Sequence, residues 1–408
     1  MKLYRGLVAA TVEALQDVFV KNRQADRVVE QLLKSNKKWG ARDRAFIAEN
    51  VYEIVRWWRL VKYVAQVEKA VESDDFWRIA GAWQLIKPQH LEGREAPESL
   101  PEWPEFEAMN PETIAERYQE GLQIRKIAQS IPDWIDVTGE AELGEQWPAE
   151  LAALNKTAPV VLRVNSLKTN VDTVREQLGT DITEPVPGVP QALALKKRIN
   201  VAALESFKSG FFEVQDAGSQ LIAPYLDVRE GVSVIDACAG AGGKSLHLAA
   251  LLGNSGSILS MDIEHFKLQE LERRAARNGV TNLTTMHISS EKIIESLAGT
   301  TDRLLLDVPC SGLGVLRRNP DSKWKLKPEF LDKIRKVQAQ ILENYSKMVK
   351  KGGKMVYATC SILPSESEEQ VRAFTKRHKV DWQFVSEHRT SPARDGFDGF
   401  YMALLERK

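Results

Sequence analysis

Two of the three cysteines in this chain stand directly after hydrophobic runs that are typical of strands. Cys310 follows Asp307 in the stretch "DVPCSGLGVLRRNPD", and Cys360 lies in the stretch "KMVYATCSILPSE". The thiolate form of cysteine is a nucleophile that adds to electron-poor carbon atoms. Both stretches are therefore predicted to do chemistry at the end of a strand. The alternative is that a cysteine serves as a small buried apolar residue, which is the interpretation we favour for Cys238.

Asp307, Cys310 and Cys360 are the side-chain types that methylation of carbon 5 of cytosine requires. That carbon is a weak nucleophile until a thiolate adds at carbon 6, which makes the ring enamine-like and able to attack a sulfonium methyl group. An acid must stabilise or protonate nitrogen 3, and a base must then remove the carbon-5 proton so that the thiolate can leave. We therefore predict these three residues to be catalytic.

A glycine-rich stretch, "DACAGAGGKS" at residues 236–245, follows an earlier strand-like run. Its glycines allow a ligand to approach the backbone, and the next helix offers free N–H groups. A Walker A loop would need glycine where the chain has Cys238, and a dinucleotide fingerprint would need its third glycine at Ser245. The third interpretation is a loop for S-adenosylmethionine. Asp262 would then hold both ribose hydroxyls, unless it only caps a helix.

The elements that must position these groups alternate between strand and helix from residue 231 onward. The predicted strands are "VSVIDACAG", "SILSMDIE", "LTTMHIS", "RLLLDVPC" and "KMVYATCS", and the segments between them have helical periodicity. Such alternation predicts an α/β fold with a doubly wound parallel sheet, whose ligands lie at the carboxyl ends of the strands. The stretches "WQFVSEH" and "GFYMALLER" are predicted to add an antiparallel edge.

Four segments are expected along the chain. Residues 1–86 show the three- and four-residue apolar spacing of helices, and residues 87–130 contain a Pro- and Glu-rich stretch that indicates a linker. Residues 131–225 read as a small α/β subdomain that binds RNA, and residues 226–408 form the domain with the parallel sheet.

Composition limits the kinds of partner. Lys and Arg number 56 and so do Asp and Glu, so a nucleic acid must meet a local basic patch rather than a bulk charge. No uninterrupted apolar stretch predicts a spanning helix, and the first twenty residues lack the apolar core of a signal peptide. Three cysteines do not make a disulfide framework, and neither cysteines nor histidines have metal-ligand spacing. We expect a cytoplasmic monomer without a metal site.

From about residue 131 to the end, the chain resembles the Nol1/Nop2/Sun-type RNA cytosine-5 methyltransferases. The matching stretches include "LRVNSLKT", "FEVQDAGSQL", "DACAGAGGKS", "DVPCSGLGVLRRNPD" and "TCSILPSESE". The resemblance implies a Rossmann-like domain with S-adenosyl-L-methionine as cofactor, Cys360 as the nucleophile and Cys310 as the residue that assists product release. The implied cofactor contacts are Cys238, Ala239, Gly240, Ala241, Gly242, Gly243, Lys244, Asp262 and Asp307.

The chain departs from the family pattern at two places. Ala241 stands where the family usually has proline, which should loosen the glycine-rich turn. After the third strand the family usually has an aspartate near the adenine, whereas this chain has Ser289 and Ser290, whose hydrogen bonds would be weaker.

The helical segment is similar to the RNA-binding fold of the antitermination factor NusB, which occurs in the bacterial small-subunit rRNA methyltransferase B branch of the family. The stretch "ARDRAFIAENVYEIVRW" carries that similarity, and a plain helical packing module is the alternative. The implied partner is rRNA.

Two stretches, "LRVNSLKT" and "RRNPDSKWKLKPEFLDKIRK", supply basic residues for RNA phosphates, the second around Trp324 as a stacking platform. The predicted contacts are Arg163, Lys168, Arg317, Arg318, Lys323 and Lys325. From Lys333 onward, an ordinary solvated helix face is the alternative. The target cytosine is expected to flip out of its stack.

Two other functions stay open. An amino-group methyltransferase would use "DVPC" as its loop after the fourth strand and would need no thiol. A non-catalytic RNA-binding assembly factor would keep a relic cofactor pocket and show no turnover.

Overall fold

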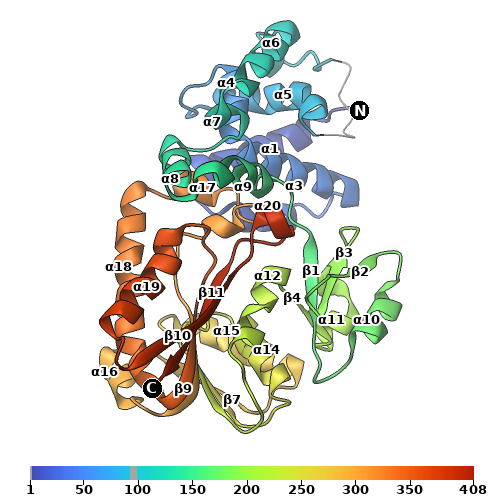
Figure 1. Cartoon of the computed structure of the whole chain (residues 1–408). Helices are drawn as coiled ribbons and strands as arrows, with labels where there is room; N and C mark the ends of the chain where they lie inside the picture. Colours follow the sequence, from blue (N-terminus) through green and yellow to red (C-terminus); the bar gives the residue numbers. More distant parts are fainter. Residues whose placement is uncertain (1, 92–98) are drawn as a thin grey trace. The chain divides into compact units, whose positions relative to one another are not determined.

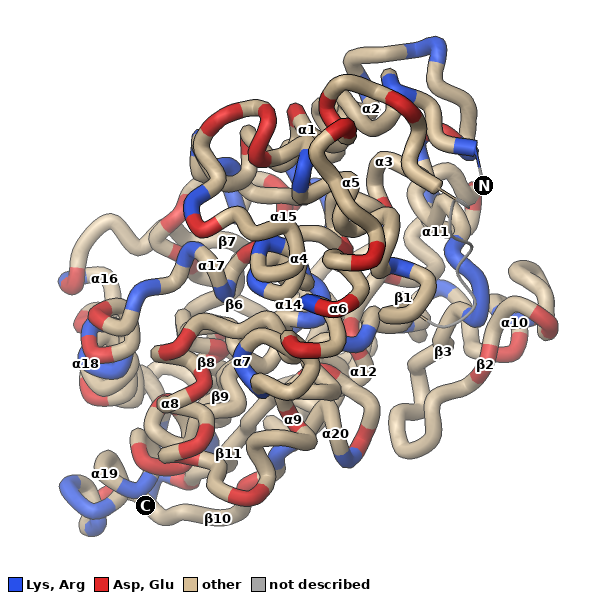
Figure 2. The backbone as a smooth tube through the Cα atoms, turned by 90° about the horizontal axis from the view of Figure 1, so that it is seen from above, with Lys and Arg blue, Asp and Glu red and all other residues tan. Residues whose placement is uncertain are grey.

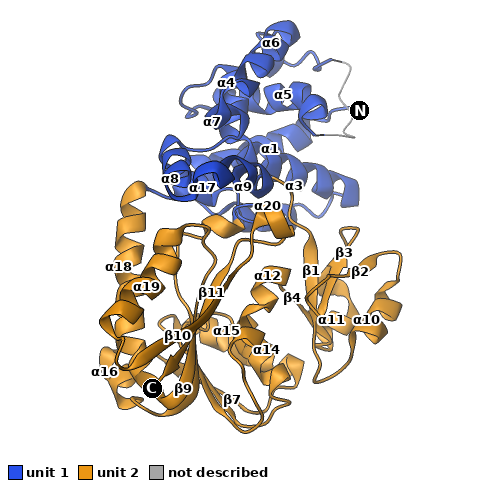
Figure 3. Ribbon diagram, viewed as in Figure 1, with its two compact units in different colours: residues 1–155, 316–327 blue, residues 156–315, 328–408 orange. Residues whose placement is uncertain are grey.

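The computed structural model describes residues 2–91 and 99–408, so residues 92–98 of the predicted linker lie outside the described residues. Internal contacts divide the chain into two units, coloured separately in Figure 3. Unit 1 contains residues 1–155 and 316–327, and unit 2 contains residues 156–315 and 328–408. No helix among the described residues is long and apolar enough to cross a membrane.

Unit 1 is helical, as the apolar spacing predicts (Figure 1). Its α-helices are α1 (Arg5–Phe19), α2 (Ala25–Ser35), α3 (Ala41–Arg56), α4 (Trp58–Ala65), α5 (Ser73–His90), α6 (Pro111–Leu122), α7 (Arg125–Ala128), α8 (Asp133–Leu143), α9 (Trp147–Leu154) and α17 (Ser322–Lys325), with 3-10 turns η1 (Pro104–Phe106) and η2 (Gly144–Gln146). Leu15, Ile47 and Trp83 are buried in one core that unites α1, α3 and α5.

The segment expected to be a linker contains regular structure at both ends. Helix α5 continues to His90, and α6 begins at Pro111, where the side chain of Asn110 accepts a hydrogen bond from the N–H of Thr113. Ile114 and Tyr118, at helical spacing, are buried in the core of unit 1. Contacts also group residues 131–155, expected in the small subdomain, with unit 1.

Residues 316–327 belong to unit 1 although the chain enters them from unit 2. The indole Nε1 of Trp324 donates to the carbonyl of Val55 over 2.7 Å. The N–H of Ala25 donates to Oδ2 of Asp321 over 3.2 Å. These bonds join parts of the chain almost 300 residues apart and fix the segment in the helical unit.

Acidification is expected to destabilise unit 1 through His90. Burial lowers the pKa of His90 to about 4, and its Nδ1 lies 3.0 Å from the hydroxyl of Tyr118. An unfolded histidine takes up a proton near pH 6.5, so between pH 6.5 and 4 the unfolded state binds more protons than the folded state. The free energy of unfolding should therefore fall by up to about 3 kcal/mol as the pH drops through that window.

Denaturant titrations followed by tryptophan fluorescence measure this effect, because of the ten tryptophans only Trp382 lies in unit 2. The variant His90→Gln, whose side chain takes up no proton, should show a smaller loss of stability over the same pH range. Equal losses in the two proteins would contradict the prediction.

Unit 2 contains two sheets. The smaller one is antiparallel with strand order β2-β3-β1-β4. Its elements are β1 (Val160–Val164), α10 (Val171–Leu178), β2 (Thr183–Pro185), β3 (Ala192–Leu195), η3 (Val201–Ala203), α11 (Glu205–Lys208) and β4 (Phe212–Val214), followed by α12 (Ala217–Gln220) and α13 (Ile222–Tyr225).

The larger sheet has the order β10-β11-β9-β8-β5-β6-β7. Its strands are β5 (Ser233–Asp236), β6 (Ser257–Asp262), β7 (Leu283–His287), β8 (Thr301–Asp307), β9 (Val349–Thr359), β10 (Trp382–Arg389) and β11 (Tyr401–Arg407). The helices are α14 (Gly243–Leu251), α15 (His265–Asn278), α16 (Glu291–Ser296), α18 (Pro328–Tyr345), α19 (Glu368–Arg377) and α20 (Pro392–Asp395), with η4 (Leu313–Val315), η5 (Ser346–Met348) and η6 (Pro364–Glu366).

This sheet confirms the predicted doubly wound α/β fold. Strands β5 to β9 run parallel, and β11 is antiparallel to both of its neighbours. Helices α16, α18 and α19 pack on one face and α13 and α14 on the other. The strand order reverses between β5 and β8, so the carboxyl ends of these strands are where a ligand of such a sheet binds.

Candidate active site

The glycine-rich loop after β5 is held at three points. The N–H of Gly240 donates to Oδ2 of Asp262 over 2.8 Å. Arg274 donates to the carbonyl of Ala241 over 2.6 Å, and Arg163 donates to the carbonyl of Gly243. These three bonds fix the turn on both sides of Ala241, so the structure gives no sign of the loosening expected from the missing proline.

Gly242 shows why this loop needs glycine. Its φ is +84°, and an added Cβ would lie 2.4 Å from the Cγ of Leu271. The backbone therefore turns into helix α14 in a conformation and a space that suit only a residue without a side chain. The first N–H groups of α14 follow directly and are free to face a ligand.

Asp236 ends strand β5 in a buried position. Its Oδ2 accepts a hydrogen bond of 2.7 Å from Ser245, which in turn accepts one from Ser260. Burial is the main cause that raises the pKa of Asp236 to about 7, with a smaller contribution from the charge of Asp307. Its Oδ1 is buried and has no hydrogen-bond partner in the described structure. This oxygen of Asp236, at the carboxyl end of β5, is available to accept a hydrogen bond from a donor group of a ligand.

Lys244 and Asp307 form an ion pair at the ends of α14 and β8. Burial alone would lower the pKa of Lys244, but the adjacent Asp307 carboxylate outweighs it and raises that pKa. The Lys244 ammonium also lies 5.7 Å from the ring centroid of Phe400. Lys244, predicted as a cofactor contact, thus also orients the predicted catalytic carboxylate.

The sulfur atoms of Cys310 and Cys360 lie 3.2 Å apart, and both thiols are free and half-buried. The hydrogen bond to Cys360 is the first cause that raises the pKa of Cys310 well above its usual value, followed by burial. The two thiols are thus within hydrogen-bond distance of each other, and either sulfur can be the donor. Asp307 ends β8, and the two cysteines follow the adjacent strands β8 and β9.

Cys238, interpreted from the sequence as a packing residue, lies in the glycine-rich loop and is half-buried. Burial raises the pKa of its thiol well above the ordinary value, and the charges of Asp236, Asp307 and Asp262 add to the rise. A thiol that keeps its proton is a poor nucleophile. Its place after β5 separates this cysteine from Cys310 and Cys360, which follow β8 and β9.

Three active-site loops touch through their backbones at Gly314. Its N–H donates to the carbonyl of Cys360 over 3.0 Å, and its carbonyl accepts from the N–H of Gly399 over 2.8 Å. An added Cβ would lie 2.0 Å from the carbonyl oxygen of Gly399 and 2.8 Å from that of Cys360.

The substitution Gly314→Ala should therefore force the cysteine loops apart. We expect a loss of methyl transfer of roughly a hundredfold, since misplacement by about 1 Å costs that much. The melting temperature should fall by several degrees because the overlap is with backbone atoms. A matched control is Gly6→Ala, where an added Cβ meets nothing within 4 Å. Wild-type activity in the Gly314 variant would contradict the geometry.

One buried carboxylate that the sequence reasoning missed ties these loops together. Glu366 accepts hydrogen bonds from the hydroxyls of Ser311 and Ser361 and from the side chain of Gln338. We call these four residues the Glu366 hub. In the sequence Glu366 stands in the polar stretch "PSESEEQ", which resembles the start of an exposed helix.

The far side of the predicted cofactor site is open. Ser289 and Ser290 follow β7 and are both exposed, and an adenine contact there stays a prediction. Ile263, directly after Asp262, is 66% exposed, and its carbonyl lies 3.0 Å from Nε2 of His287. An exposed apolar side chain next to a strand-end carboxylate is a signal that the sequence reasoning did not use.

The two predicted RNA contacts in the small subdomain have internal partners. Arg163 is 2% exposed and supports the glycine-rich loop, so the prediction that it contacts RNA is corrected to a structural role. Burial lowers its pKa to about 9. Lys168 is exposed, but its ammonium donates to the carbonyls of Ser209 and Arg277.

The predicted contacts after Cys310 also need correction. Arg317 is 5% exposed and Lys323 is 2% exposed, so neither can reach an RNA phosphate. Lys325 donates to a backbone carbonyl of unit 1 over 2.6 Å, while Arg318 is half-buried. Lys and Arg are otherwise spread along the chain among Asp and Glu, as Figure 2 shows.

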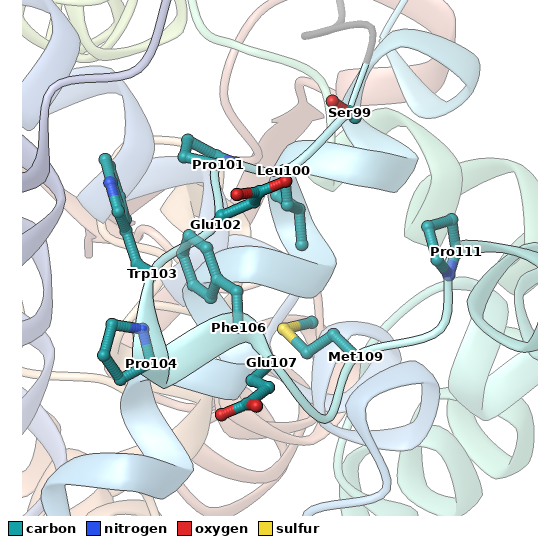
Figure 4. Close-up of a pocket in the computed structure, with 10 residues that line it drawn as sticks. All are labelled: Ser99, Leu100, Pro101, Glu102, Trp103, Pro104, Phe106, Glu107, Met109 and Pro111. Atoms are coloured by element: carbon teal, nitrogen blue, oxygen red, sulfur yellow. The ribbon is translucent and has the colours of Figure 1, made fainter.

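A cavity of 580 Å³ lies elsewhere, in unit 1, and Figure 4 shows its lining. Trp103, Phe106 and Met109 contribute its apolar wall. No predicted site residue lines it. Among the described residues no group of three His, Cys, Asp or Glu side chains is placed to hold a metal ion.

Comparisons with known proteins converge on one family. The family model described as 16S rRNA methyltransferase RsmB/F matches residues 223–406, and the RsmF/B-like ferredoxin-like domain matches residues 131–202. A probable ribosomal RNA small subunit methyltransferase B from Synechocystis is 34% identical over 64% of this chain and 60% of its own length. The ribosomal RNA small subunit methyltransferase B of Vibrio cholerae is 32% identical over 72% of this chain and 70% of its own length.

Solved structures share the fold. The crystal structure of PH0851 matches with a TM-score of 0.82 at 22% identity, over 100% of this chain and 99% of that one. A methyltransferase homolog protein from Pyrococcus horikoshii matches with a TM-score of 0.62 at 25% identity, over 71% of this chain and 99% of its own. The NSun6 structure from the same organism, with SFG, has a TM-score of 0.62 at 18% identity and covers 68% of this chain and 99% of its own.

Proposed function

The chain belongs to the RsmB/F family of 16S rRNA methyltransferases, and from this premise we propose that it methylates carbon 5 of a cytosine in ribosomal RNA. The observation that carries the proposal is the pair of free thiols 3.2 Å apart, after strands β8 and β9. Methylation of carbon 5 of cytosine needs a thiol nucleophile that adds to carbon 6, whereas methylation of an amino group needs no thiol.

The methyl donor is S-adenosylmethionine, which supplies an electrophilic methyl group on a sulfonium. In this chain the glycine-rich loop would face its amino-acid part, where Oδ1 of Asp236 lacks a partner. Asp262 now accepts a hydrogen bond from the N–H of Gly240, and it would accept hydrogen bonds from the ribose hydroxyls instead. The exposed side chain of Ile263 would cover one face of the adenine.

Cys360 begins the reaction by forming a bond from its sulfur to carbon 6 of the flipped cytosine. Addition of the thiolate brings a negative charge onto the ring, and Asp307, held by Lys244, transfers to nitrogen 3 a proton that neutralises it. Carbon 5 then takes the methyl group and still carries its hydrogen. Water takes up that proton with the assistance of Cys310, and the electron pair of the carbon–hydrogen bond restores the double bond and expels the sulfur from carbon 6. Nitrogen 3 returns its proton to Asp307. Cys360 leaves as the thiolate.

Two other functions make different demands on the same site. An amino-group methyltransferase would use Asp307 and the glycine-rich loop but would be indifferent to both thiols. A non-catalytic assembly factor would bind RNA without turnover, and it would not need sulfurs in contact or a buried carboxylate that aligns their loops. The paired thiols therefore favour the carbon-5 reaction.

The test is to incubate the protein with bacterial 16S rRNA and S-adenosylmethionine labelled in its methyl group, and then to digest the RNA to nucleosides. Label in 5-methylcytidine supports the proposal. Label in N4-methylcytidine or in a purine would replace it with the amino-group alternative, and absence of label despite RNA binding would favour the assembly factor. The assay should be run in parallel on naked rRNA and on small-subunit particles.

A further inference from the structure

Both cysteine loops carry a serine directly after the cysteine, and both serines bind the same oxygen of one carboxylate. The Ser361 hydroxyl donates to Oε1 of Glu366 over 2.6 Å, and the Ser311 hydroxyl donates to the same atom. The two hydroxyl oxygens lie 3.4 Å apart. The two Cys-Ser pairs thus meet at a single atom.

The second carboxylate oxygen is also fully used. Oε2 of Glu366 accepts from the backbone N–H of Ser311 over 2.8 Å and from Nε2 of Gln338 over 3.0 Å. Gln338, on α18, donates through the same nitrogen to the carbonyl of Pro309 over 3.0 Å, and Tyr357 donates to the carbonyl of Glu366. Four donors around one carboxyl group match the ionised form, which only accepts.

Each serine also sets the turn of its own loop. The hydroxyl of Ser311 accepts the N–H of Leu313 over 3.3 Å, and that of Ser361 accepts the N–H of Leu363 over 3.1 Å. Because both hydroxyls are fixed to Glu366, the two turns are fixed relative to each other. Glu366 is 0% exposed, so water does not compete for these bonds.

We propose that Glu366 is a positioning residue that holds the loops of Cys310 and Cys360 in register, so that both sulfurs face one cytosine. This inference deepens the proposed carbon-5 reaction and rests on it for the catalytic consequence. It assigns no contact between Glu366 and the substrate, because the carboxylate is enclosed by the two loops and α18.

The charge of Glu366 also supports a division of labour between the sulfurs. It contributes, after the hydrogen bond to Cys360 and burial, to the raised pKa of the Cys310 thiol. A buried anion near Cys310 thus opposes a second anion there. This effect of Glu366 on Cys310 is consistent with the proposed attack by Cys360.

Phenylarsine oxide tests the geometry without RNA or methyl transfer. The trivalent arsenic condenses with two thiols, exchanging its oxygen for two arsenic–sulfur bonds and releasing one water, and it binds tightly only where both sulfurs can reach one atom. The wild type should capture it with one equivalent, and Cys310→Ala should not. In Glu366→Gln, whose amide cannot accept from all four donors, the affinity should drop by at least about tenfold.

Glu369→Gln is the matched control, because it removes the same charge at an exposed position three residues away. Kinetics supply the second readout: Glu366→Gln should lower kcat by roughly 10- to 100-fold and leave the KM for S-adenosylmethionine within about twofold, since the glycine-rich loop is untouched. Where Glu366→Gln does not fold, Ser361→Ala removes one of the two serine bonds and should weaken arsenical capture in the same direction.

Wild-type arsenical affinity in a folded Glu366→Gln or Ser361→Ala variant would overturn the positioning role. Weakened capture with an unchanged kcat would overturn its catalytic consequence. A wild-type protein that captures the arsenical but methylates no cytosine would instead refute the proposed function and leave the geometric role of Glu366 standing. The three failures are therefore distinguishable.

Discussion

Replacement of Cys360 by alanine is expected to lower methyl transfer to RNA by at least about a thousandfold while leaving the affinity for S-adenosylmethionine unchanged. Cys360 follows strand β9, whereas the glycine-rich loop follows β5, and Asp236 and Asp262 end β5 and β6. Loss of the sulfur removes the addition at carbon 6, without which carbon 5 does not attack the methyl group.

The measurement combines single-turnover methylation with calorimetric titration of the cofactor. Cys238→Ala is the matched control, since it removes a thiol from the loop while the pair at β8 and β9 stays intact, and it should retain at least about a tenth of wild-type activity. Full activity in Cys360→Ala would rule out the covalent mechanism and leave an amino group as the methyl acceptor.

Replacement of Cys310 by alanine should trap the RNA on the protein. Cys360 can still add to the ring, but removal of the carbon-5 proton loses its assistance, so the bond between sulfur and carbon 6 persists. The sulfur 3.2 Å from that of Cys360 is also lost, which leaves Cys360 free to attack. Protein purified from cells should then show a slow, ribonuclease-sensitive band on a denaturing gel.

Two variants make the trapping experiment decisive. The double variant Cys310→Ala/Cys360→Ala should lose the band because the attacking sulfur is absent. Cys360→Ala alone should show none, and a band from that variant instead would reverse the roles of the two cysteines. Sequencing of the trapped RNA identifies the target strand and nucleotide.

The catalytic strands were predictable because each is buried on both faces and therefore reads as a continuous apolar run. "RLLLDVPC" and "KMVYATCS" place their cysteines at strand ends by simple counting, and parallel pairing of β8 with β9 brings those ends together. Local pattern and topology rules are enough for this part of the site, since each residue is positioned by its own strand.

The wrong predictions have a common cause: the positions of these residues depend on contacts with residues that are distant in the sequence. The basic run after Cys310 looks like a solvent-facing RNA contact, but Lys323 donates to Asn155 and Trp324 donates to Val55, in a different unit from Cys310. Charge along the sequence carries no information about such an insertion. The Pro- and Glu-rich stretch likewise led to the prediction of a linker where the chain forms α6, which packs against α4 and α5.

Glu366 escaped notice for a related reason. Glutamates after a proline and a serine ordinarily begin a helix on the surface, as Glu368 and Glu369 do in the first turn of α19. What distinguishes Glu366 is the pair of serines that follow the two cysteines, one of them 55 residues upstream. A repeated Cys-Ser dipeptide is a signal that can be searched for, and it points to a shared acceptor.

The insertion of residues 316–327 into unit 1 means that the polypeptide passes between the two units three times, at residues 155, 315 and 327. A single cut therefore cannot release an intact catalytic half. A fragment that starts at residue 156 would carry the half-buried Trp324 and the buried Leu316 and Lys323 without the helices that enclose them. Exchange of the helical part would therefore also have to replace residues 316–327, a segment that begins six residues beyond Cys310.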